Sequence, residues 1–387
     1  MVAGVAAAIW FIVGCAASEP PANEQGQAAM TSTSTATAAG GCSPTDPTTD
    51  LESILAFVPD TAANREYVTV ADLQAFLDDQ GKELPGDFRE IRFVDPVTLF
   101  TPTPLLQDAL SQANEDEDPL ADEFGIGLGQ IRMGVSAGLA PDVTELLIGD
   151  VDPAAVETAV AADPFWSEQQ ETVESNGETF YSWGGDNEVQ VKGGSPIRKL
   201  GIGGRLWVTD GIAAYTRSTP VMEALLAGCS GAEATLADDD AYAGMAQRLD
   251  DFDGAFRVVL TDQVREPGAA GAPEGSSGTA AEADDTAPLE GVTAYGFASG
   301  PSSEPDQARI RLVLASGSDA EATANADAFV ERVESGTSAT TSQPWSDLLR
   351  VERIEADGPF VVVELLADNA QVLESNLMRR DSLVVST

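Results

Sequence analysis

After residue 50, short runs of apolar residues are separated by turn-forming residues, and this pattern predicts a series of β-strands. The runs are rich in β-branched and aromatic residues, which favour strands. Several follow one another through short turns, so we expect them to pair antiparallel. The predicted strands cover residues 67–70, 126–135, 144–148, 178–183, 205–209, 212–216, 256–261, 292–297, 310–315 and 360–366.

A strand, a capping residue and a helix recur along the chain. In each copy a Ser, Thr or Asp precedes a helical stretch, where its side-chain oxygen can accept a bond from a backbone N–H. Proline follows the cap in two copies and is tolerated at the first helical position. The copies span 144–161 with Asp152 and Pro153, 212–227 with Thr219 and Pro220, and 310–333 with Ser318 and Asp319.

These repeated modules predict an α+β fold. We expect largely antiparallel sheets with helices packed on one face, arranged as two similar lobes. The lobes would cover residues 51–200 and 201–387, and the second would contain a low-complexity loop at 265–289. A further helix is predicted after Asp72, which is a candidate cap.

The first fourteen residues, MVAGVAAAIWFIVG, are apolar and carry no charge. Their length fits the apolar region of a signal peptide and falls short of the ~20 residues that a bilayer-spanning helix needs. The run ends in Ile12-Val13-Gly14-Cys15, which resembles a bacterial lipobox. In proteins with that motif the cysteine thiol receives a diacylglyceryl group and the chain is cut before it. The resemblance implies that Cys15 is the lipid-attachment residue and the first residue of the mature chain.

No Lys or Arg precedes Cys15, whereas signal peptides begin with basic residues. A start codon placed too far downstream would explain the difference. The alternative is a buried apolar N-terminus in which the VGC sequence arose by chance. Residues 15–50 favour the first interpretation, because they are mostly Ala, Ser, Thr, Pro and Gly and can bury little apolar surface. We therefore expect a lipidated cysteine and a disordered tether before the folded domain.

The chain has 64 acidic and 20 basic residues and a net charge of −44. Such a charge repels nucleic acids and anionic lipid surfaces, so we expect neither as a partner. Only Lys82, Lys192 and Lys199 are lysines. Scarce lysine with excess carboxylate is typical either of a GC-rich genome or of a high-salt habitat, where salt screens the self-repulsion. The sequence leaves both explanations open.

The three cysteines are Cys15, Cys42 and Cys229. If Cys15 carries lipid, the other two can pair in an exported protein, and the bridge would hold the end of the tether against the domain. Two unrelated thiols are the alternative.

The residue types that many catalytic sites need are missing. The chain has no histidine, which excludes Ser-His-Asp and Cys-His catalysis and the usual zinc sites. It has no dinucleotide or P-loop fingerprint, and the DxDG fragment at 251–254 lacks the glutamate that an EF-hand has at position twelve. Paired carboxylates suit glycoside hydrolysis, but 64 acids form many chance pairs. We therefore predict no cofactor, no metal site and no catalytic residue.

Three stretches resemble segments of uncharacterised exported proteins and putative lipoproteins of bacteria, chiefly actinobacteria. They are residues 55–70 (LAFVPDTAANREYVTV), 147–160 (LIGDVDPAAVETAV) and 236–249 (LADDDAYAGMAQRL). The resemblance implies a surface location and no established activity.

Together these features predict a lipid-anchored, non-catalytic protein on the extracytoplasmic face of the cell membrane. Its role would be binding or structural, towards an envelope protein or a small molecule. One alternative is the substrate-binding lipoprotein of a transporter, although such receptors usually have parallel βαβ units. A second is a carboxylate-dependent hydrolase, for which we expect an apolar-walled groove with two carboxylates and a raised pKa.

Overall fold

The structure is a computed structural model. It describes residues 42, 50–80, 104–113, 118–163, 168–190, 194–195, 197–264, 287–302, 307–338, 340–368 and 383–384. The predicted signal and Cys15 lie outside the described residues. The same holds for the predicted tether apart from Cys42 and Asp50, and for the low-complexity loop up to residue 286. Residues 39–387 form one compact unit.

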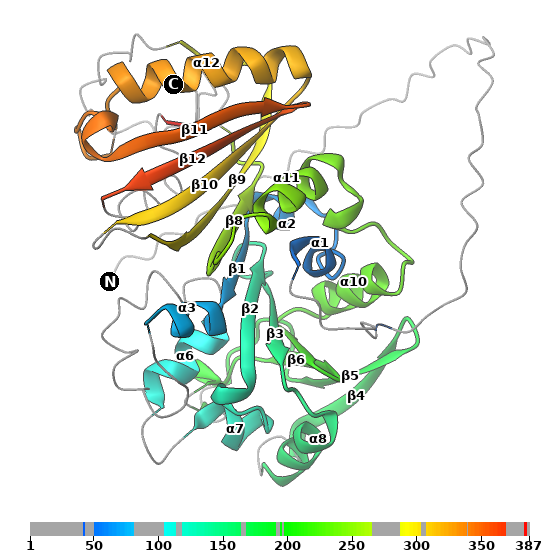
Figure 1. The fold of residues 1–387 in the computed structure, drawn as a ribbon. Helices are drawn as coiled ribbons and strands as arrows, with labels where there is room; N and C mark the ends of the chain where they lie inside the picture. Colours follow the sequence, from blue (N-terminus) through cyan, green and yellow to red (C-terminus); the bar gives the residue numbers. More distant parts are fainter. Residues whose placement is uncertain are drawn as a thin grey trace, which may run out of the picture. The chain divides into compact units, whose positions relative to one another are not determined.

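The strands of the described residues form one antiparallel sheet of twelve, in the order β11-β12-β10-β9-β8-β1-β2-β3-β7-β6-β5-β4 (Figure 1). This confirms the predicted α+β class with largely antiparallel pairing. The strands are β1 (Val68–Asp72), β2 (Ile131–Ala137), β3 (Thr144–Gly149), β4 (Gln170–Ser175), β5 (Glu178–Trp183), β6 (Gly204–Thr209), β7 (Ile212–Thr216), β8 (Arg257–Thr261), β9 (Val292–Pro301), β10 (Ala308–Ser316), β11 (Leu349–Asp357) and β12 (Phe360–Ala367).

The sheet contains the same arrangement twice. The first copy runs β1-β2-β3, then α8 (Pro153–Ala162), then β6-β7, and the second runs β8-β9-β10, then α12 (Asp319–Ser335), then β11-β12. In each copy the strands lie side by side in the order first, second, third, fifth, fourth. The copies meet where β1 pairs with β8, with Val68 opposite Leu260. The pair β5–β6 crosses the predicted division near residue 200, so the sheet is continuous at that point.

Capping residues begin the helices that follow β3 and β10, as predicted. Asp152 accepts a backbone N–H bond of 2.9 Å before α8, and Ser318 accepts one of 3.3 Å before α12. The prediction that Thr219 caps the next helix is wrong, because Thr219 is the first residue of α10 (Thr219–Cys229). Its N–H donates to the carboxylate of Asp186, 2.8 Å away. A residue distant in sequence therefore takes the capping role.

Helices cover both faces of the sheet, whereas the sequence predicted one. Successive strand residues point to opposite faces: in β3, Leu146 and Ile148 join one core and Leu147 joins the other. An unbroken apolar run of this kind is typical of a strand that is buried on both sides. One face carries α1 (Leu51–Leu55), α10 and α11 (Asp240–Asp250), and the other carries α3 (Leu73–Gln80), α6 (Pro104–Gln112), α7 (Pro119–Phe124) and α8 in the first copy and α12 in the second.

In the described ranges, no helix combines the length and the apolar character needed to cross a bilayer.

Candidate functional site

The structure joins two of the three predicted site residues. Cys42 and Cys229 form a disulfide, with their Cα atoms 5.3 Å apart. Cys229 is the last residue of α10, and Cys42 is buried against the core beneath that helix. The backbone N–H of Cys42 donates to Glu178 at 3.1 Å, and the same carboxylate accepts from the indole of Trp207 at 3.2 Å. A disulfide bond and a backbone hydrogen bond therefore attach Cys42 to the folded domain.

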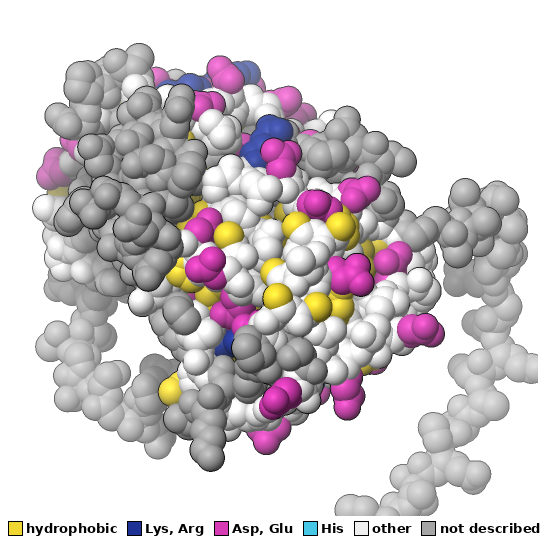
Figure 2. All heavy atoms as spheres, turned by 90° about the horizontal axis from the view of Figure 1, so that it is seen from below, with side chains coloured by type: hydrophobic (Ala, Val, Ile, Leu, Met, Phe, Trp, Pro, Cys, Tyr) yellow, Lys and Arg dark blue, Asp and Glu magenta, His cyan; other side chains and the backbone are white. Residues whose placement is uncertain are grey.

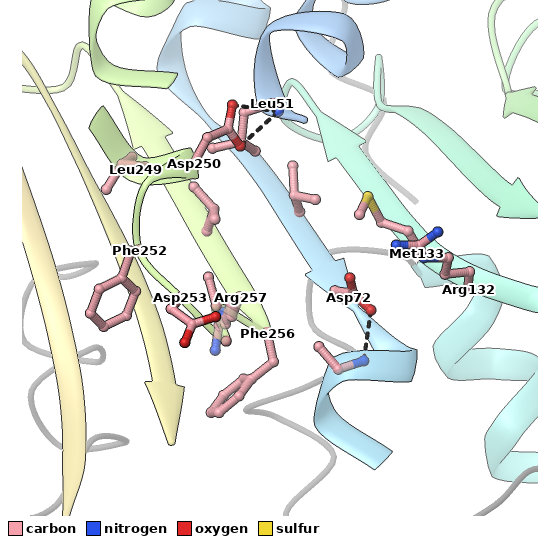
Figure 3. A pocket seen from close by; sticks show the side chains of 15 residues that line it. Leu51, Asp72, Arg132, Met133, Leu249, Asp250, Phe252, Asp253, Phe256 and Arg257 are labelled. Atoms are coloured by element: carbon pink, nitrogen blue, oxygen red, sulfur yellow. Dashed lines mark hydrogen bonds between the residues drawn. The ribbon is translucent and has the colours of Figure 1, made fainter. Parts of the chain in front are cut away.

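A pocket of about 410 Å³ lies on the sheet face that α1 and α11 cover (Figure 3). Its walls come from the start of α1, the end of β1, the start of β2, the end of α11 and the segment that leads into β8. The apolar residues of the lining, most of which are buried, are Leu51, Val70, Ala75, Met133, Leu249, Phe252, Ala255, Phe256 and Val258. The charged part is Asp72, Arg132, Asp250, Asp253 and Arg257.

Asp250 ends α11 and caps the start of α1. Its two carboxylate oxygens accept from the backbone N–H of Leu51 at 2.9 and 3.0 Å. Burial raises the pKa of Asp250 to about 6, and repulsion from Asp50 and Asp251 acts in the same direction. Backbone N–H donors of α1 oppose the rise in pKa. This carboxyl therefore releases its proton at a higher pH than an ordinary aspartate does.

Asp72 lies at the end of β1 and begins α3, as the sequence predicted. Its carboxylate accepts from the backbone N–H of Ala75 at 2.8 Å. Burial raises the pKa of Asp72, while this N–H and the charge of Arg132 lower it. Figure 3 shows Asp72 and Asp250 on separate elements that line the same pocket.

Sequence reasoning did not identify this pocket. It assigned Asp72 to a helix cap, which the structure shows, and it considered residues 251–254 for calcium binding. No local pattern distinguishes Asp250 among 64 acidic residues. Its partner Leu51 lies 199 positions earlier in the chain, so only the tertiary fold brings the pocket together.

Acidic side chains dominate the charged surface on one face of the molecule. On the face drawn in Figure 2, Asp and Glu side chains are spread widely and clearly outnumber Lys and Arg. Within the described residues, no three His, Cys, Asp or Glu side chains gather closely enough to hold a metal ion. The acidic surface is therefore dispersed over this face.

No family model matches the chain, and no curated protein matches it. Among solved structures it is similar to TP0453. Crystal form III of TP0453 aligns with a TM-score of 0.37 and 9% identity, covering 84% of this chain and 97% of that one. Crystal form I aligns with a TM-score of 0.34 and 7% identity, covering 85% and 97%. A likeness at this level carries no argument about function.

Proposed function

We propose that this chain is a lipid-anchored protein of the bacterial cell envelope that acts by binding and not by catalysis. The observation that carries the proposal is the disulfide between Cys42 and Cys229. Disulfides form and persist in oxidising compartments outside the cytoplasm and are rare inside it. The bridge therefore supports export, which the lipobox-like sequence before Cys15 independently predicts.

The position of the bridge also suits an anchored domain. Cys42 lies 27 positions after Cys15, and a chain of that length spans at most about 95 Å when fully extended. The anchor would therefore keep Cys42 within about 95 Å of the membrane surface. The disulfide attaches the predicted tether, near its end, to the last residue of α10. Tension on the anchor would reach the domain at one defined point.

The structural roles of the pocket carboxylates Asp72 and Asp250 support binding over catalysis. Both Asp72 and Asp250 accept backbone N–H bonds that hold helix termini. A general acid or base must exchange its proton during each turnover, and protonating either residue would weaken the cap that it provides. The pocket is of a size that suits a small molecule. A role as receptor of a transporter is less well supported, since the described strands pair antiparallel.

The anchor is tested by fractionation of cells that process lipoproteins and express the full chain. We expect the wild-type protein in the membrane fraction and Cys15→Ala in the soluble or secreted fraction. Cys42→Ala is the matched control, because it removes a cysteine and the bridge while leaving Cys15 in place. Soluble wild-type protein, or a Cys15→Ala variant that stays with membranes, would contradict the anchor.

One observation favours a second function. A carboxyl whose burial raises its pKa to about 6, in a pocket that other carboxyls also line, resembles the setting of a general acid in glycoside hydrolysis. If the pocket is catalytic, purified protein should release nitrophenol from a panel of neutral nitrophenyl glycosides, and Asp250→Asn should abolish the release. Our proposal predicts no turnover by either protein.

A further inference from the structure

We propose that α6 is a pH-dependent cover on the sheet of the first copy, and that it opens more often as the pH rises from 6 to 8. The cover closes over Glu145 of β3, a buried carboxyl that the first turn of α6 contacts. This role is independent of the anchor and of the binding function proposed above. It follows from a comparison of the two copies, from the contact between α6 and β3, and from the charges around that contact.

A row of polar side chains crosses the first copy on the sheet face that α6 covers. The row follows the strand register through Thr69 on β1, Ser136 on β2, Glu145 on β3 and Tyr215 on β7. All four residues are buried, with 5% or less of each exposed. Within the described ranges, the hydroxyl of Thr69 has no hydrogen-bond partner. Burying polar groups in this way costs free energy, so the row destabilises the closed core.

The second copy has apolar side chains at the same positions. Val259 on β8 pairs with Thr69 across the junction of the copies. From there the row continues through Phe297 on β9, Leu312 on β10 and Val363 on β12. These residues belong to the buried core beneath α12. The fold can therefore build an apolar core at this row, and the first copy has polar groups there instead.

Glu145 holds the start of α6 against the sheet. Its carboxyl accepts from the backbone N–H of Leu105, the second residue of the helix, at 2.7 Å. The helix has nine residues, and its buried apolar side chains in the described part are Leu105, Leu106 and Ala109. The cover of the second copy, α12, has 17 residues and buries Phe329 among others. Elements with little buried apolar surface open locally at a lower free energy than the rest of a fold, so α6 is the weaker cover.

The groups around Glu145 come from three elements. Burial raises the pKa of Glu145 from 4.5 to about 8; the Leu105 N–H and Arg217, just after β7, oppose the rise, and Asp108 of α6 adds to it. Tyr215 on β7 stays neutral, because burial raises its pKa to about 12. A negative charge on Glu145 is therefore desolvated while α6 is closed, and it is repelled by an acid of the cover itself.

The direction of the pH effect follows from proton binding. While α6 is closed, Glu145 holds its proton up to about pH 8; when α6 lifts and water reaches the carboxyl, it ionises near the ordinary value of 4.5. Opening therefore releases a proton. Closure is most stable below pH 4.5, and this stability is lost as the pH rises towards 8. We expect the population of the open form to rise at least tenfold between pH 6 and pH 8.

Hydrogen exchange of the full, disulfide-bonded protein, followed by mass spectrometry, measures this opening. After correction for intrinsic exchange rates, the amides of α6 should exchange through an opening that is more populated, and less sensitive to urea, than the one that exposes α12. The α6 opening should become at least tenfold more populated between pH 6 and pH 8. Equal protection of α6 and α12 at every pH, or an α6 opening that does not change with pH, would overturn the inference.

A variant assigns the opening to Glu145. Glu145→Gln keeps an acceptor for the Leu105 N–H and cannot ionise, so the population of its α6 opening should not change between pH 6 and pH 8. Glu157→Gln, at an exposed glutamate of α8, is the matched control and should follow the wild type. A Glu145→Gln protein that keeps the pH dependence of the wild type contradicts the inference. If this variant does not fold, the comparison of α6 with α12 in the wild type decides by itself.

Discussion

Glu145 is a carboxyl enclosed within the core of the first copy. It lies on β3 with only 4% of its surface exposed, and it accepts from the backbone N–H of Leu105 at the start of α6, at 2.7 Å. Burial raises the pKa of Glu145 to about 8; the Leu105 N–H and Arg217 oppose the rise, and Asp108 adds to it. The folded protein therefore holds a proton here that the unfolded chain releases at much lower pH.

Replacing Glu145 should change the pH dependence of stability in a defined direction. Because its pKa is above the ordinary value of 4.5 in the folded state, the folded protein binds more protons between pH 4.5 and 8, and the free energy of unfolding falls as pH rises through that range. Glu145→Gln keeps an acceptor for Leu105 and removes the titration. We expect the variant to gain stability over the wild type by on the order of a few kcal/mol between pH 5 and pH 9.

Urea unfolding at a series of pH values measures this difference. Glu157→Gln, a change at an exposed glutamate of α8, is the control and should follow the wild type. Parallel curves for the wild type and Glu145→Gln would show that Glu145 does not titrate in this range.

Some features of single residues could be predicted from the sequence, and others could not. The caps at Asp72, Asp152 and Ser318 were predictable, because a cap depends on neighbours within three positions. The buried state of Glu145 was not, since it requires contacts between β3 and α6, 40 positions apart. The pocket around Asp250 depends on contacts of the same long-range kind.

At the scale of elements, the strands that were missed are the two edges of the sheet. β4 (QETVES) and β11 (LRVERIEAD) carry charged or polar residues at most positions. Edge strands tolerate such residues because they are exposed, and charge there discourages pairing with other chains. Charged residues therefore weaken, at the edges, the apolar patterns that identify interior strands. The interior strands β3, β7 and β10 were predicted close to their observed bounds.

The disulfide should contribute measurably to the stability of the elements that it connects. It closes a loop of 187 residues between Cys42 and the end of α10, and cross-links across long loops restrict the unfolded chain most. We expect the Cys42→Ala/Cys229→Ala double variant to lose about 2–5 kcal/mol of unfolding free energy and to melt several degrees lower. Differential scanning calorimetry measures the change.

The reducing agent provides the control for this prediction. Dithiothreitol should lower the melting temperature of the wild type towards that of the double variant and leave the variant unchanged. Equal melting temperatures for the oxidised wild type and the variant would show that the bridge does not stabilise the fold.

At the scale of the whole molecule, the net charge of −44 should make stability depend on salt. Carboxylates spread over the surface repel one another in the folded state, and the Debye length falls from about 10 Å at 0.1 M salt to about 3 Å at 1 M. We expect the melting temperature to rise as NaCl increases over this range. A flat or falling curve would contradict a destabilising self-repulsion and would remove the high-salt explanation of the composition.

The whole molecule also contains one arrangement of strands twice, joined through β1 and β8. The repeated strand–cap–helix pattern predicted such a duplication. Its boundary could not be placed from the pattern, because the β4–β5 hairpin lengthens the first copy and pairs with β6. The pocket lies at the end of this junction where β1 ends and β8 begins.

The central claim is that the mature protein begins at a lipidated Cys15 and carries an exported, disulfide-bonded domain. Intact mass spectrometry of protein extracted from the envelope of the producing cells tests it most directly. We predict a mass that lacks residues 1–14, includes acyl groups on Cys15 and falls by two hydrogens for the Cys42–Cys229 bridge. A full-length, unacylated mass would contradict the account.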